Sequence, residues 1–157
     1  MDAMQSLLTF LTETNQVVPE EKTEAWAQDG KLLLATSATL NSYVLRYTAN
    51  FEITDVAINP TRFFTAVSYW INKYLPGREA FGLPDPEFFT ERLQNKNFDL
   101  GLRIEFEEEI ELVPDPNGEW LMDDGLNYSV KSDFGQLADG EILQVVDSHT
   151  QDNGLKN

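Results

Sequence analysis

The stretch that decides the fold is FDLGLRIEFEEEIEL, residues 98–112. Apolar side chains occupy every second position from Phe98 to Phe106, and polar residues or glycine lie between them. This period of two predicts a strand with one buried and one solvated face. The same pattern runs from Leu45 to Ile53 and predicts a second long strand. Strands of this kind are typical of antiparallel sheets, so we expect an α+β fold with a mostly antiparallel β-sheet.

Glu108 interrupts the first of these patterns, because it falls on the apolar side of the strand. The alternation resumes with Ile110 and Leu112. A charged residue at such a position indicates either a β-bulge or a strand that has left the body of the domain. The sequence leaves both interpretations open.

The residues that follow predict a projecting β-hairpin arm at about residues 107–124. Pro114 to Gly118 form a tight reversal, after which Trp120 and Met122 are expected to lie beside the outgoing strand. An isolated two-stranded ribbon is marginally stable, so the apolar side of the arm should rest against a partner. The expected contact residues of the arm are Ile110, Leu112, Pro114, Asp115, Asn117, Gly118, Trp120 and Met122.

Two main helices are expected to pack on the sheet. Apolar residues at helical spacing predict one from Asp2 to about Thr14. Asn59 as N-cap and Pro60 in the first turn predict another, which ends before Pro76. The Pro-Glu-Glu start at Pro19 predicts a further helix that is anchored by Trp26 and ends at Gly30.

The remaining segments are less strongly patterned. Residues 77–86 are rich in Gly and Pro and predict a loop. The next residues fit either a helix that begins at Asp85-Pro-Glu87 or a strand from Phe89 to Leu93, and we favour the strand. A short strand from Ile142 to Val146 is expected to close one domain of residues 1–146, followed by a polar tail of residues 147–157.

Composition excludes several classes of function. The 157 residues include 27 acidic and 11 basic ones, a net charge of -16, which is unsuited to nucleic-acid binding or to anchoring on anionic membranes. No cysteine is present, and the one histidine, His149, lies in a polar stretch. No run is apolar enough to span a bilayer. We therefore expect no membrane attachment, no metal site and no cofactor.

Carboxylates are the only abundant reactive groups, and the densest run of them lies in the strand described first. It comprises Glu105, Glu107, Glu108, Glu109 and Glu111. This run is either a solvated strand face or a negative field that keeps nucleic acid from adhering. Asp115, Asn117 and Gly118 match part of a calcium loop, but Val113 occupies its first ligand position, so we interpret the segment as a turn.

The order of these patterns resembles the tail completion protein R family of contractile-tailed temperate phages. Arg46-Tyr47 opens a strand that ends at Thr54-Asp-Val56, the aromatic helix carries Trp70, and Phe98-Asp99 opens the strand that ends in the glutamate-rich run. The similarity covers roughly residues 24–124. It also favours a strand at Phe89 to Leu93.

The resemblance implies a structural virion protein with no enzymatic activity. It implies a homo-oligomeric ring, of six subunits to match the tail tube, that caps the head-proximal end of the tail after assembly in the host cytoplasm. Its partners would be the tail tube protein, together with sheath and neck proteins, and DNA would only pass through an acidic channel. Two other hypotheses remain open: an acidic DNA mimic that inhibits a DNA-binding enzyme, and a carboxylate hydrolase.

Overall fold

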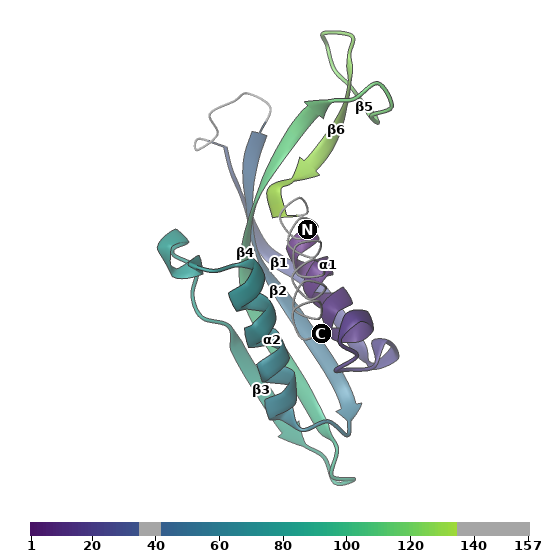
Figure 1. Ribbon diagram of the computed structural model, residues 1–157, viewed down its shortest axis with the longest axis vertical. Coiled ribbons are helices and arrows are strands. Elements are labelled where there is room, and N and C mark those ends of the chain that lie inside the picture. The colour runs from purple at the N-terminus through teal and green to yellow at the C-terminus, as the bar shows by residue number, and fades with distance from the viewer. Residues whose placement is uncertain (35–41, 135–157) are drawn as a thin grey trace, which may run out of the picture.

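The computed structural model describes residues 1–34 and 42–134 and shows an α+β fold (Figure 1). Within these residues, six strands form one antiparallel sheet with the order β1-β2-β4-β6-β5, and β3 also pairs with β4. The strands are β1 (Thr23–Leu33), β2 (Ser42–Val56), β3 (Glu87–Arg92), β4 (Phe98–Pro114), β5 (Trp120–Leu121) and β6 (Asn127–Ser132). The expected fold class is confirmed.

Strands β2 and β4 are the centre of the sheet, and both were predicted from their alternation. They pair in continuous register from Ser42 opposite Glu111 to Ile53 opposite Leu100. The apolar residues of both strands point to one face, where Tyr47, Ala49, Phe51, Ile53, Leu100, Ile104 and Phe106 are at most 1% exposed. We call this the core face of the sheet and the opposite side the open face.

Two helices cover the core face (Figure 1). Helix α1 (Asp2–Thr9) continues into a π-helical turn, Phe10–Thr14, so the predicted N-terminal helix is confirmed. Helix α2 (Pro60–Tyr74) begins where it was predicted, because the Asn59 side chain accepts a hydrogen bond from the Thr61 N–H over 2.9 Å. Its Phe63 and Trp70 are fully buried against the sheet.

The helix predicted from Pro19 to Gly30 is wrong. Only a 3₁₀ turn forms at Glu20–Lys22, after which the chain enters β1 and pairs with β2. The proline and glutamates do start a turn, but the following residues alternate between a helix-covered and an exposed side of the sheet. Ala25 is packed against the core, whereas Trp26 is 41% exposed and does not anchor a helix.

The favoured strand at Phe89 to Leu93 is confirmed by β3, which pairs with residues 98–103 of β4. Gly101 of β4 leaves room for the ring of Phe89 directly opposite, since an added Cβ would lie 1.7 Å from that ring. The loop at residues 77–86 contains one short 3₁₀ turn, Arg78–Phe81. The predicted strand at Ile142 to Val146, His149 and the polar tail lie outside the described residues.

Candidate functional site

The predicted arm exists in part, but its strand pairing is different. The end of β4 pairs with β6 from Ile110 opposite Ser132 to Pro114 opposite Tyr128, and β5 pairs with the other edge of β6. We call this unit the distal ribbon (residues 110–132); it extends beyond both helices (Figure 1). The expectation that Trp120 and Met122 pair with Ile110 and Leu112 is therefore wrong, because β6 lies between them.

The predicted reversal at Pro114 to Gly118 is present and is held by local hydrogen bonds. The Asn117 N–H donates to Asp115 Oδ1 and the Gly118 N–H to the Asp115 carbonyl, each over 2.9 Å. A Cβ at Gly118 would lie 2.1 Å from the Tyr128 carbonyl oxygen, so only glycine fits there. A second turn follows, in which the Tyr128 hydroxyl donates to Asp124 Oδ2 over 2.6 Å.

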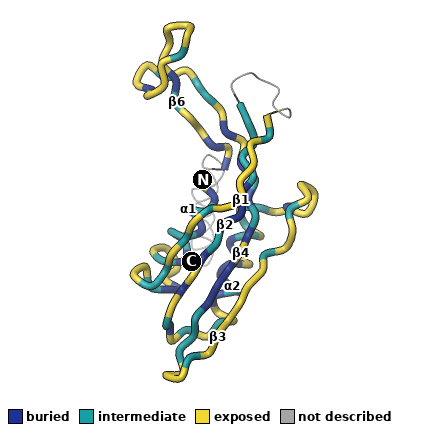
Figure 2. The backbone as a smooth tube through the Cα atoms, turned by 180° about the vertical axis from the view of Figure 1, so that it is seen from behind, coloured by how far each residue is buried: buried dark blue, intermediate teal, exposed yellow. Residues whose placement is uncertain are grey.

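One side of the distal ribbon continues the core face, and no helix of residues 1–34 and 42–134 lies over it. Register places Leu112, Val130, Tyr128 and Trp120 on this side. Trp120 is 51% and Val130 46% exposed, whereas the core-face residues of the sheet centre are buried (Figure 2). The distal ribbon therefore presents apolar surface of the kind that is buried elsewhere on the same face.

The acidic run divides between the two faces of β4. Glu105, Glu107, Glu109 and Glu111 lie on the open face by register. Arg46 on the neighbouring strand forms ion pairs with Glu105 at 3.2 Å and with Glu107 at 3.9 Å. Glu111 lies opposite Lys131 of β6. The negative field of this face is thus partly neutralised near its middle.

Glu108 does not belong to the acidic face, and neither interpretation of its position was right. The register of β2 and β4 continues through it without a bulge, and it is 0% exposed on the core face. Its Oε1 accepts hydrogen bonds from the Asp2 N–H and the Ser132 hydroxyl, each over 2.9 Å. Its Oε2 accepts one from the Tyr47 hydroxyl over 2.5 Å. A buried carboxylate with these partners is satisfied where it lies.

This carboxylate joins the beginning of α1, both central strands and the last residue of β6. A negative charge at a helix N-terminus is favourable because the free N–H groups and the helix dipole point toward it. Burial and the Glu108 carboxylate raise the pKa of Tyr47, so its hydroxyl keeps its proton as a donor. In the sequence, the only signal of this hydrogen-bonded cluster is the position of Glu108, a charged residue on the apolar side of its strand.

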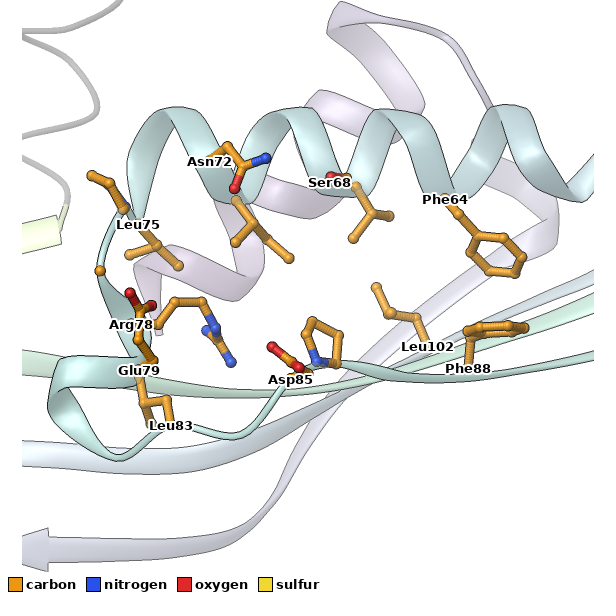
Figure 3. Close-up of a pocket in the computed structure, with 15 residues that line it drawn as sticks. Phe64, Ser68, Asn72, Leu75, Arg78, Glu79, Leu83, Asp85, Phe88 and Leu102 are labelled. Atoms are coloured by element: carbon orange, nitrogen blue, oxygen red, sulfur yellow. The ribbon is translucent and has the colours of Figure 1, made fainter.

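A pocket of about 370 Å³ lies between α2, β3 and the loop at residues 77–86 (Figure 3). The rings of Phe64 and Phe88 pack against each other in a tilted arrangement at one end of it, and the side chains of Arg78, Glu79 and Leu83 lie at the other. The buried Arg78 donates hydrogen bonds to the carbonyls of Glu105 and Pro84, over 2.9 and 2.8 Å. Burial lowers the pKa of its guanidinium, which remains charged.

Arg78 therefore secures the loop to the edge of β4, where neither β3 nor β6 covers the strand. Both terminal nitrogens of its guanidinium donate to backbone carbonyls, which gives this side chain a structural role. In residues 1–34 and 42–134, no group of three or more acidic or histidine side chains could hold a metal ion. None of the helices in this part of the chain is long and apolar enough to cross a membrane.

Comparison with known families identifies the chain independently of these surfaces. The family model described as P2 phage tail completion protein R (GpR) matches residues 1–127. These residues include both helices, strands β1 to β5 and the first turns of the distal ribbon. Comparison with curated proteins and with solved structures gave no match. Because the family model matches most of its length, the chain belongs to the phage tail completion protein R family.

Proposed function

We propose that this tail completion protein acts as a ring-forming subunit at the head-proximal end of the tail. Six copies, which match the symmetry expected of the tail tube, would cap the tube and offer a surface to the neck. The tail tube protein would be its direct partner, with sheath and neck proteins as further contacts. Its role in this position is geometric and needs no catalytic group.

The observation that carries this proposal is the apolar side of the distal ribbon, which no helix in the described part of the chain covers. Trp120 and Val130, which lie on this side by register, are 51% and 46% exposed. Exposed apolar patches commonly mark contacts between proteins. The protein therefore has a surface that would be buried on assembly, which a subunit of a ring requires.

The open face supplies the second part of the proposal. Glu105, Glu107, Glu109 and Glu111 would line the channel through which DNA passes, where negative charge prevents adhesion to the phosphates. A DNA mimic would instead present an unbroken row of carboxylates. Arg46 pairs with two of these four residues, so the open face fits a channel wall better than it fits a mimic.

Native mass spectrometry and negative-stain images of the purified full chain test the ring directly. The expected result is a closed ring, formed by the chain alone or on addition of tail tube protein. A monomer under both conditions would contradict the proposal. A ring whose central opening is too narrow for duplex DNA would contradict the proposed DNA channel, but it would still agree with the proposed ring-forming role.

A further inference from the structure

Helix α2 differs in charge from the rest of the molecule. The whole chain has 27 acidic and 11 basic residues, yet α2 contains Arg62 and Lys73 and no carboxylate. Neither residue has an ion pair within 4 Å in the described part of the chain. The side of α2 that carries Arg62 and Lys73 is therefore a basic surface on an acidic protein.

This surface also carries an exposed aromatic ring. Tyr69, seven residues after Arg62 and four before Lys73, lies on the same side of the helix as both and is 56% exposed. The Lys73 ammonium is 5.8 Å from the centroid of its ring, and the ring of Phe10 stacks on it at 6.2 Å. Apolar and cationic groups therefore lie side by side on this surface.

The tip of the distal ribbon has the complementary character. Residues 115–126 contain four carboxylates, Asp115, Glu119, Asp123 and Asp124, and no basic residue. Trp120 and Leu121 between them are 51% and 72% exposed. The tip thus combines apolar side chains with negative charge, whereas α2 combines an aromatic ring with positive charge.

These two surfaces cannot meet within one molecule. The distal ribbon projects from one end of the elongated sheet, and α2 packs along the other part (Figure 1). A contact between them must join two copies, and it is heterologous because each copy uses a different surface. Heterologous contacts close into rings when the rotation between neighbours allows it.

We propose that the tip of the distal ribbon of one copy binds the side of α2 that carries Arg62, Tyr69 and Lys73 in the next copy. This contact rests on the proposed ring and specifies how its subunits join. Burial of Trp120 against Tyr69 supplies most of the affinity, since exposed ion pairs contribute little by themselves. The charges of Arg62, Lys73, Glu119 and Asp123 direct the encounter and exclude the wrong orientation.

Charge reversal on each surface tests the contact. One variant carries Arg62→Glu and Lys73→Glu; the other carries Glu119→Lys and Asp123→Lys. Asp124 is left unchanged because it holds the Tyr128 hydroxyl. Each variant alone places like charges on the two surfaces, so its oligomer fraction in native mass spectrometry should fall about tenfold at low salt. In a one-to-one mixture every contact again pairs opposite charges, and oligomers should return.

The control variant carries Arg92→Glu and Lys96→Glu, which make the same change in net charge at the turn between β3 and β4. It should assemble like the wild type. Oligomers that persist in the α2 variant, or folded variants that fail to assemble when mixed, would overturn the contact while the ring itself stands. A wild-type chain that never forms a ring would overturn the ring as well.

Discussion

The Tyr47 hydroxyl donates a 2.5 Å hydrogen bond to Glu108 across 61 residues of sequence, inside the core and between the two central strands. Glu108 also accepts from the Asp2 N–H and the Ser132 hydroxyl, so one carboxylate links the N-terminal helix to the base of the distal ribbon. Glu108 therefore contributes both to the stability of the helix-covered part of the sheet and to the position of the distal ribbon.

Glu108→Ala should destabilise the fold strongly, because it leaves the buried hydroxyls of Tyr47 and Ser132 and the Asp2 N–H without their acceptor. We expect a loss of about 3 kcal/mol in the free energy of unfolding, measured in urea. Glu108→Gln keeps one acceptor oxygen and should cost less. Glu109→Gln, one residue along and on the open face, is the matched control and should change stability by under about 0.5 kcal/mol. Equal losses at both positions would contradict the assignment.

Sequence patterning predicted the centre of the fold because strong alternation and strong caps coincide there. It also marked Glu108 as anomalous, but it could not show its partners, which lie between 24 and 106 residues away in the chain. Only the folded arrangement of α1, β2 and β6 brings them together. A single charged residue out of phase is compatible with a bulge, a projection or a buried acceptor.

The two errors of strand assignment have local causes. In β1, the small side chains of Ala25 and Ala27 occupy the covered positions and hide the period of two, while the Pro-Glu-Glu signal suggests a helix. In the distal ribbon, the apolar residues nearest the first turn were taken as the returning strand. A second turn at residues 122–125 instead passes the pairing to β6, which was not predicted.

The Asp55 carboxylate should make the free energy of unfolding depend on pH in the acidic range. Its Oδ1 accepts hydrogen bonds from the side chains of Asn95 and Asn97, over 2.8 and 2.9 Å, and these bonds, with a smaller contribution from Lys22, lower its pKa. A lowered folded pKa contributes stability above the unfolded value of about 4. This contribution is lost as the pH falls through the folded value.

Asp55→Asn should therefore flatten the decline in the free energy of unfolding below about pH 4, as measured by urea titrations between pH 6 and pH 2. Asp133, whose pKa burial raises, contributes the opposite slope, but it is present in both proteins and cancels from the difference. Glu52→Gln on the exposed side of the same strand gives the background effect of losing one carboxylate. Parallel curves for wild type and Asp55→Asn would rule out the effect.

The pair formed by Phe89 and Gly101 predicts a non-additive effect. Gly101→Ala places a Cβ against the Phe89 ring and should cost about 1–2 kcal/mol in the wild type. In a Phe89→Ala background the ring is gone, and the same substitution should cost under about 0.3 kcal/mol. Gly30→Ala is the control, because its Cβ would meet only ordinary contacts at 3.7 Å. Additive costs would show that the ring simply moves aside.

Trp120→Ala separates assembly from folding. Trp120 is 51% exposed in the single chain, so its removal should lower the melting temperature only slightly. In a ring, the same side chain would be buried against a neighbour, and its loss should reduce the oligomer fraction about tenfold or more, since buried tryptophans dominate many interfaces. Native mass spectrometry and thermal denaturation of the same preparation measure both quantities.

Phe81→Ala is the matched control for this variant, because Phe81 is an aromatic residue that is 66% exposed but lies outside the distal ribbon. It should leave both the melting temperature and the oligomer fraction near the wild-type values. If Trp120→Ala lowers the melting temperature and leaves the oligomer fraction unchanged, the ribbon stabilises its own subunit and the proposed interface is wrong. If both variants reduce assembly equally, association depends on exposed aromatic surface anywhere on the protein, and the distal ribbon is not a specific interface.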